Sequence, residues 1–446
     1  MYELWTNLGA EVINISYTGS RSIIHRVIQI DFSSISAFLT GFSTYPQPLR
    51  LRLRIFTIFF LYKQTHQAVR KGELSTIMKL VFDKADLVKS VGIAMKAVSG
   101  KTTMPILECI LIDASSNVIK FTSNDMELGI ETIVTGMILE RGIVALDAKI
   151  FSEIVRKLPD NQVTIETDEN LVTTITCEKA KFNIPGQSGE DFSYLPILET
   201  SDCVSISQFT LKELIRQTIF SIAANENNKL MTGELFEIKD NTLRVVSLDG
   251  HRIAIRRIEL KDSYPDRKVV VPGKTLNEIS KILSGEMDDQ IDIYFSENHI
   301  MFKFDDTTVV SRLIDGEYFR IDQMLSSDYE TKVTINKKEF LSCIDRATLL
   351  VKEGDKKPII IDIQDGAMEL QINSAMGSMK EEIDINKEGK DIMIGFNPKF
   401  LIDALRVIDD EEISIYLVNP KAPCFIRNEE ESYIYLILPV NFNSVR

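Results

Sequence analysis

The residues of this chain that could do acid–base chemistry together are Asp249, His251 and Arg252, which lie within four positions of one another. A carboxylate can orient an imidazole as a general base, but the base then needs a nucleophile beside it. We find no nucleophile paired with His251 in the sequence, and we find no phosphate-binding loop of the Walker type. We therefore favour a turn with a hydrogen-bonded histidine, and we expect no catalytic residues.

Metal chemistry is disfavoured by the spacing of the candidate ligands. The chain has five cysteines without a paired spacing and four histidines. Zinc sites and disulfide frameworks both need more regular patterns. The pattern fits a reducing compartment, so we predict a cytoplasmic protein without a metal or a cofactor.

Three lysines recur at a period of 125 residues, at Lys149, Lys274 and Lys399. Two residues after each lysine comes a bulky apolar residue, at Phe151, Leu276 and Leu401. Acidic residues follow at Glu153, Glu278 and Asp403, which we place in a first helical turn, where the helix dipole favours carboxylates. Fixed-period similarity indicates tandem copies of one structural unit. The chain is therefore predicted to contain three copies of one domain.

The elements around the lysines show the periods of helices and strands. Apolar residues in the first copy follow the helical spacing at Phe151, Ile154, Val155 and Leu158, with Ser152, Arg156 and Lys157 predicted on the opposite face. Alternating strands follow the helices, beginning at Val163, Ile291 and Ile413. A strand and a helix precede them, and the strands are predicted to end at Phe82, Phe209 and Ile335.

This order of elements predicts an α+β fold, with two helices packed on antiparallel sheets in each copy. The predicted domains are residues 78–202, 203–328 and 329–446. Residues 1–77 lie outside the repeat, and we predict a non-native or disordered extension, with translation starting at Met78. The apolar run at 55–62 is too short to span a bilayer, which needs about 20 helical residues. It also lies too far from the N-terminus for a signal peptide.

The charge of the chain is unevenly distributed. The net charge is −14, although residues 1–77 hold eight basic and four acidic residues. Outward helix positions are predicted to be basic at Lys89, Lys96, Arg156, Arg216, Lys281, Arg346 and Arg406. An acidic body with a basic helical surface suits contact with DNA at one place only. The alternative is that these side chains are ordinary solvated surface charges.

Five short strings in order resemble the bacterial DNA polymerase III β subunit family, the sliding clamps. They are Thr103-Met104-Pro105-Ile106-Leu107, Asn124-Asp125-Met126-Glu127, Asp249-Gly250-His251-Arg252-Ile253-Ala254, Ile394-Gly395-Phe396-Asn397 and Leu438-Pro439-Val440. The resemblance covers residues 78 to about 440. It implies a head-to-tail homodimer, a ring of six domains that encloses duplex DNA without regard to sequence. Such a ring tethers the replicative polymerase, and its other partners include clamp-loader subunits and further clamp-binding peptides.

The resemblance also implies two sets of site residues. The DNA-binding set is Lys101, Lys149, Asn225, Lys229 and Lys274. A peptide-binding pocket between the second and third copies would be formed by Met231, Leu248, Gly250, His251, Arg252, Ile253, Met324, Leu436, Leu438, Pro439 and Val440. Two features depart from the family pattern. Phe319 replaces the usual proline after Tyr318, and the tail extends past Val440, so that Phe442 could cover the pocket.

Two other functions stay open at this point. One is an enzyme built on duplicated α+β domains, which would need a convergent acid, base and nucleophile. The other is a scaffold tethered to a membrane surface through residues 50–62, where three arginines precede the apolar run. The resemblance favours a non-catalytic processivity subunit that does not bind membranes.

Overall fold

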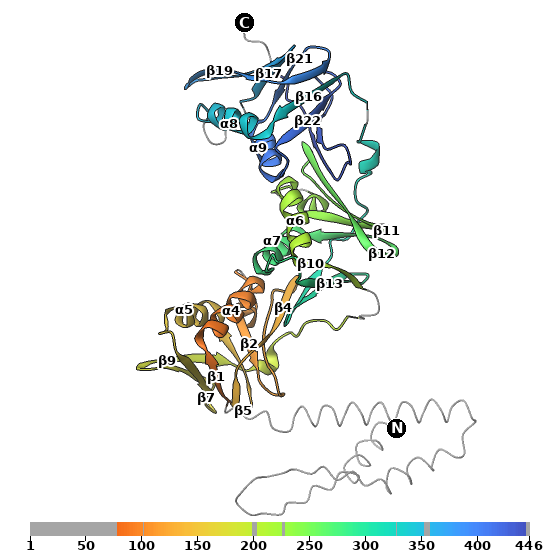
Figure 1. Cartoon of the computed structure of the whole chain (residues 1–446). Coiled ribbons are helices and arrows are strands. Elements are labelled where there is room, and N and C mark those ends of the chain that lie inside the picture. The colour runs from red at the N-terminus through yellow and green to blue at the C-terminus, as the bar shows by residue number, and fades with distance from the viewer. Residues whose placement is uncertain are drawn as a thin grey trace, which may run out of the picture. The chain divides into compact units, whose positions relative to one another are not determined.

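The computed structural model describes residues 78–100, 102–198, 203–224, 228–326, 328–351 and 357–442 (Figure 1). These residues all belong to one compact unit, Ser75–Arg446. The predictions for residues 1–77, including the apolar run and the start at Met78, lie outside the described residues.

The first copy starts with strand β1 (Met78–Asp83) and helix α4 (Lys84–Ala94), followed by the short 3-10 helix η2 (Met95–Ala97). A second helix, α5 (Ala148–Lys157), follows five strands. The strands before it are β2 (Cys109–Asp113), β3 (Ile119–Asn124), β4 (Leu128–Val134), β5 (Met137–Glu140) and β6 (Ile143–Asp147). The strands after it are β7 (Gln162–Thr167), β8 (Val172–Cys177) and β9 (Ala180–Gln187).

The second copy has the same order but uses two long strands where the first has five. It runs β10 (Cys203–Ser207), α6 (Gln208–Thr218), η5 (Ile219–Ser221), η6 (Lys229–Thr232), β11 (Gly233–Leu248) and β12 (Arg252–Pro272). Helix α7 (Gly273–Ile282) and strands β13 (Gln290–Phe295), β14 (His299–Phe304) and β15 (Thr307–Arg312) complete it. The β11–β12 hairpin has irregular register between Ile238 and Thr242, and it takes the place of the five strands β2 to β6 of the first copy.

The third copy follows the short linker helix η7 (Ile321–Gln323). Its first half is β16 (Thr331–Asn336), α8 (Lys337–Thr348), β17 (Ile359–Gln364), β18 (Ala367–Ser374), β19 (Gly377–Asp384), β20 (Asn386–Gly389) and β21 (Ile392–Phe396). Its second half is α9 (Pro398–Val407), β22 (Glu412–Leu417), β23 (Cys424–Arg427) and β24 (Tyr433–Ile437). The predicted α+β architecture with three copies is confirmed, and the strand pairs are antiparallel.

Sheets run across the boundaries between copies. Strand β4 of the first copy pairs with β15 of the second, and β12 of the second pairs with β24 of the third. We call these contacts joint 1–2 and joint 2–3. A strand ladder satisfies backbone donors and acceptors on both sides, so each joint is a continuous part of the sheet.

The predicted helix stripes form the cores of the copies. Phe151 and Val155 of α5, Leu276 and Ile279 of α7, and Leu401 and Leu405 of α9 are all at most 1% exposed. Because each helix buries one stripe against its sheets, the helical period in the sequence was a reliable guide.

Three details of the prediction are wrong. Phe209 does not end a strand but lies in α6, because the strand of the second copy ends at Ser207, whose side chain caps the helix at Thr210. Glu153, Glu278 and Asp403 are each the sixth residue of their helices, so the dipole of the first turn does not explain them. Ser152 is buried, not on the solvent face, and its hydroxyl accepts a hydrogen bond from Arg156.

Candidate nucleic-acid interface and peptide pocket

A cavity of about 560 Å³ lies between helices α4 and α5 of the first copy and α7 of the second. Four cationic side chains line it, Lys96, Arg156, Lys274 and Lys281, together with the carboxylate of Glu278. Val88, Val91 and Val155 form the apolar part of its wall. Helices from two copies therefore present a common, mostly cationic surface at joint 1–2.

Acidic neighbours hold several of these cations in place. Lys274 Nζ binds the carboxylate of Asp125, whose own turn begins β4. Lys281 Nζ donates to Glu278 at 2.7 Å, and Lys96 Nζ lies 3.9 Å from the same carboxyl group. Exposed ion pairs of this kind contribute little to stability, but they restrict where the ammonium groups can point.

Of the described residues in the predicted DNA-binding set, only Lys274 lines the cavity. Lys149 at the start of α5 and Lys229 in η6 are exposed, while Lys101 and Asn225 lie outside the described residues. Lys96, Arg156 and Lys281 join Lys274 at the cavity. The outward helical phase of these three was visible in the sequence, but their shared location depends on how α4, α5 and α7 pack.

The Asp249–Arg252 segment forms the tight turn between β11 and β12. Gly250 has a φ of +88°, a conformation that glycine adopts without strain. Asp249 Oδ1 accepts hydrogen bonds from the backbone amides of His251, at 2.9 Å, and Arg252, at 3.1 Å. The His251 ring stacks on Phe400 of the third copy at 6.1 Å. This geometry agrees with the interpretation of the segment as a turn.

Arg252 is the central side chain of joint 2–3, although it is only 7% exposed. Its guanidinium donates to Asp249 Oδ2 at 3.0 Å, to Asp403 Oδ2 of α9 at 2.7 Å and to the carbonyl of Phe220 at 2.5 Å. It also lies over the rings of Phe400, at 4.5 Å, and Phe220, at 5.3 Å. These contacts turn Arg252 toward the joint. They give the acidic residue of the third copy, Asp403, a cationic partner.

Four apolar members of the predicted peptide pocket belong to one cluster across joint 2–3. Leu248, Ile253 and Leu436 are buried at its base, and Met231 packs against them from η6. Met324, Leu438 and Val440 are exposed by 37–48% and lie outside that buried cluster. A buried base with exposed apolar side chains around it is the composition expected of a peptide-binding surface.

The structure shows where the two departures from the family pattern, Phe319 and the tail after Val440, pack. Tyr318 and Phe319 pack against the same cluster, with their rings 5.5 Å apart, so an aromatic residue occupies the position of the usual proline. Phe442 does not lie on the cluster: its ring packs against Gly395, where an added Cβ atom would come within 2.7 Å. The amide of Val440 donates to the carbonyl of Gly395 at 2.8 Å, which directs the chain toward β21.

A charged contact fixes the linker that carries Met324. Arg244 of β11 donates to Asp322 of η7 at 2.6 Å, and the Arg244 side chain is itself largely buried. The hydrogen bond from Arg244 lowers the pKa of Asp322 below its ordinary value. Ile321 belongs to the apolar cluster and Leu325 packs against it, so the pair helps to hold the segment that carries Met324.

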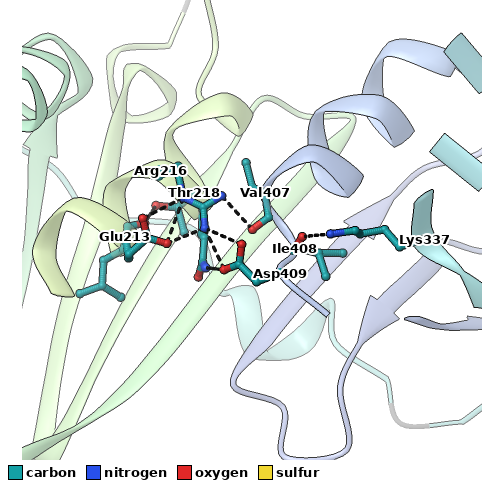
Figure 2. Close-up of polar contacts among 9 residues, drawn as sticks. Glu213, Arg216, Thr218, Lys337, Val407, Ile408 and Asp409 are labelled. Carbon is teal, nitrogen blue, oxygen red and sulfur yellow. Dashed lines mark hydrogen bonds and ion pairs between the residues drawn. The ribbon is translucent and has the colours of Figure 1, made fainter. Parts of the chain in front are cut away.

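A second contact across joint 2–3 lies at the ends of two helices, and Figure 2 shows it. The Arg216 guanidinium, near the end of α6, binds Glu213 in its own helix and Asp409 beyond α9 at 2.9 Å. It also donates to the carbonyl of Val407, the last residue of α9, at 3.2 Å. Lys337 donates to the next carbonyl, that of Ile408. Cations thus satisfy carbonyl groups at the C-terminus of α9.

Within the described ranges, His, Cys, Asp and Glu side chains form no group of three or more that could hold a metal ion. No helix within those ranges has both the length and the apolar character needed to cross a membrane.

Comparison with known proteins gives one consistent result. Family models described as the N-terminal, central and C-terminal domains of the DNA polymerase III beta subunit match residues 78–196, 205–319 and 322–441. A "Beta sliding clamp" of Staphylococcus epidermidis is 33% identical over 375 residues, covering 82% of this chain and 99% of the relative.

Solved structures agree with the sequence comparisons. A putative DNA polymerase III beta subunit from Eubacterium rectale is 72% identical, with a TM-score of 0.80. The DNA polymerase sliding clamp of Bacillus subtilis is 35% identical, with a TM-score of 0.79. Each comparison covers 82% of this chain and 100% of the solved chain.

Proposed function

The chain belongs to the DNA polymerase III beta subunit family, the sliding clamps, and we propose that two copies form a closed ring that holds the polymerase on duplex DNA. The ring, the DNA path and the peptide pocket are the parts of this proposal that need support from the structure. The observation that carries it is a pair of complementary strand edges at the two ends of the repeat.

The two joints follow one rule. In joint 1–2, Ile130 of β4 lies opposite Val309 of β15, and in joint 2–3, Ala254 of β12 lies opposite Tyr435 of β24. Ile130 and Ala254 are equivalent positions, because Ser123 and Ser247 are their cross-strand neighbours and both serines donate to the end of the first helix. Each joint therefore pairs a middle strand of one copy with the last strand of the next.

Within the described residues, two strands have no such partner in a neighbouring copy. They are the middle strand of the third copy and the last strand of the first. Strand β19 of the third copy is equivalent to β4 and β12, and it is an edge strand of its four-stranded sheet. Strand β9 of the first copy is equivalent to β15 and β24, yet in the described structure residues 180–184 pair only with β8. We infer that β9 of one subunit pairs with β19 of the other, which places Phe182 opposite Met379 of the partner subunit.

Exposed apolar side chains at these edges support the same contact. In joint 2–3, Phe220 after α6 packs on Tyr435 of β24, with the ring centroids 5.6 Å apart. The equivalent residues at the free ends are Leu349, which is 74% exposed, and Phe182, which is 40% exposed. Pairing two subunits would bury both side chains, and a second identical contact would close the ring.

The cationic cavity at joint 1–2 fits a weak contact with the DNA backbone. Lys96, Arg156, Lys274 and Lys281 come from helices, and flexible ammonium and guanidinium groups bind phosphates without reading bases. The acidic partners Asp125 and Glu278 reduce the net charge there, which keeps the attraction weak enough for sliding.

Retention on DNA should depend on the topology of the DNA. After loading by the clamp loader onto a nicked circular plasmid, the protein is expected to stay bound through gel filtration, and to be lost when a restriction enzyme linearises the plasmid. Only a protein that encloses DNA without tight binding can slide off an end. Equal retention on circular and linear DNA would contradict enclosure, and an end-blocking protein on the linear DNA should restore retention.

The apolar cluster at joint 2–3 is proposed to bind the tails of polymerases and repair factors. A peptide with Leu and Phe side chains could fill the space beside Met324, Leu438 and Val440. Replacing Leu438 by aspartate is expected to weaken binding of a fluorescent polymerase-tail peptide by about tenfold or more, because it places a charge in an apolar contact. Fluorescence anisotropy measures this affinity.

The control for this measurement is Leu139→Asp, on β5 of the first copy, where the leucine is also exposed. It introduces the same charge far along the chain from the cluster. Equal affinities of both variants and the unmodified protein would refute this location of the peptide site.

The alternative of an enzyme on duplicated domains is not favoured. The family is one of processivity clamps, and we propose that this member is likewise non-catalytic. His251 supports this view, since its ring stacks on Phe400 in the joint.

A further inference from the structure

One core position of the repeat changes chemical type in the second copy. Ile110, Glu234 and Ile359 are equivalent, because each lies opposite the residue that stands two positions before the second helix of its copy. All three are 0% exposed. The second copy therefore places a carboxyl group where the other copies place a branched alkyl chain.

Two neighbouring core positions are likewise apolar in the first copy and polar in the second. Thr218, at the end of α6, is equivalent to Ala94 in the first copy and Ala347 in the third, and all three are fully buried. Ser221, three residues later, is equivalent to Ala97 and is 1% exposed. Coordinated replacement of apolar by polar residues indicates a specific polar arrangement in the second copy.

The hydrogen bonds around Thr218 determine which form of Glu234 can bind there. Glu234 lies beside Thr218, but neither of its carboxyl oxygens accepts a hydrogen bond. The hydroxyl of Thr218 donates its only proton to the carbonyl of Leu214 at 2.6 Å. Toward Glu234 this hydroxyl can only accept, so a bond between the two requires a proton on the carboxyl group.

Burial is the largest influence on the charge of Glu234. Burial raises the pKa of Glu234 well above its ordinary value and outweighs the contact with Thr218, which lowers it, and no cation among the described residues adds to that opposing effect. Glu234 in turn acts on the phenol of Tyr318, whose pKa is raised first by burial and then by Glu234. A neutral acid beside a neutral phenol leaves no uncompensated charge in the core.

Thr218 belongs to the segment that binds the third copy. Arg216 and Gln217 reach Asp409 from this end of α6, as Figure 2 shows for the arginine. Phe220 packs on Tyr435, and its carbonyl accepts from Arg252. Ser247 donates to the carbonyl of Thr218 at 2.6 Å. A residue that supports Thr218 therefore supports much of joint 2–3.

We propose that Glu234 is a neutral carboxylic acid in the folded protein, that it donates a hydrogen bond to Thr218, and that loss of its proton loosens joint 2–3. Glu234 is then a positioning residue, which acts on the joint through the last turn of α6. The result is a clamp whose second and third copies are held together less firmly as the pH rises.

The pH dependence of unfolding tests this proposal, with Glu234→Gln as the variant. Glutamine keeps a donor for Thr218 but cannot ionise. A carboxyl group with a raised pKa stabilises the fold fully below its unfolded pKa, about 4.3, and this stability is lost as the pH rises through the folded pKa. The unfolding equilibrium constant of the unmodified protein, divided by that of the variant, is expected to rise about tenfold per pH unit in this window.

The control is Glu259→Gln, which removes an exposed carboxyl group from β12. Its pH profile should run parallel to that of the unmodified protein. A parallel profile for Glu234→Gln as well would overturn the proposal. These measurements need neither DNA nor peptide, so their failure is distinct from failure of the proposed clamp function.

Two further measurements locate the effect. Infrared spectroscopy at neutral pH should show the carbonyl band of a buried protonated carboxylic acid, which Glu234→Gln removes; this band is accessible even if the variant folds poorly. Hydrogen exchange of residues 433–437, corrected for intrinsic rates, should become faster at high pH in the unmodified protein and stay unchanged in Glu234→Gln. An absent band, or exchange that changes equally in both proteins, would contradict the proposal.

Discussion

Replacing Phe182 by aspartate is expected to convert the proposed dimeric ring into monomers. Phe182 is 40% exposed in the part of β9 that pairs only with β8, and the proposed register places it in the centre of the proposed contact between subunits. An aspartate there would have to be buried without a partner, and a central aromatic residue of an interface commonly contributes 2 kcal/mol or more, roughly 30-fold in affinity. Because a closed ring contains the contact twice, the free energy of dimerisation should change by twice this amount.

Sedimentation equilibrium at several protein concentrations measures this change directly. The control is Val118→Asp, since Val118 is also 40% exposed but lies in the loop between β2 and β3. This variant should remain a dimer. A second variant, Leu349→Asp, tests the other side of the same contact and should behave like Phe182→Asp. If Phe182→Asp kept the association constant of the unmodified protein, the inferred pairing of β9 with β19 would be wrong.

Replacing Arg252 by methionine is expected to destabilise the protein by about 3–5 kcal/mol, the range for breaking a buried ion pair. Methionine keeps apolar contact with the rings of Phe220 and Phe400 but cannot donate to Asp249, Asp403 or the Phe220 carbonyl. The Asp403 side chain, which is 18% exposed, would then lack its main partner in the joint. Urea denaturation measures the free energy of unfolding. The midpoint of the transition that disrupts joint 2–3 should move to a lower urea concentration.

Arg257→Ala provides the matched control on the same strand. Arg257 pairs with Glu431 across the same joint at 3.3 Å, but both side chains are at least 30% exposed, so a loss below about 1 kcal/mol is expected. Adding Asp403→Asn to Arg252→Met should recover part of the lost stability, because it removes the unpaired carboxylate. Equal losses for Arg252→Met and Arg257→Ala would show that burial does not strengthen the Arg252 contacts.

The period of the sequence predicted more of the fold than any single motif did. Equivalent lysines 125 residues apart are each the second residue of equivalent helices, and the strands predicted to begin at Val163, Ile291 and Ile413 each begin one residue earlier, at equivalent places. The reason is that a buried helix stripe or strand face needs apolar residues at a fixed spacing in every copy. The limits of the three domains and the roles of the site residues remain predictions.

The sequence predictions were wrong at positions whose residue type is not set by packing in the core. Phe209 looked like the end of a strand, although the helix begins at Gln208, since a half-buried aromatic residue suits either element. The acidic residues at 278 and 403 were assigned to a helix dipole, whereas Glu278 lies 3.9 Å from Lys96 of the first copy and Asp403 pairs with Arg252 of the second. Ion pairs between distant segments leave no periodic signal in the chain.

The sequence by itself determined the three copies, their order of helices and strands, and the family, because these depend on residue type at short and regular spacing. The tertiary structure alone decided that Arg252 holds joint 2–3, that cations of η2, α5 and α7 share one cavity, and that β19 is an edge strand while residues 180–184 of β9 pair only with β8. It also showed that Glu234 takes the place of an isoleucine in the core. Each of these features joins residues far apart in the chain, so packing had to bring them together before their chemistry could be recognised.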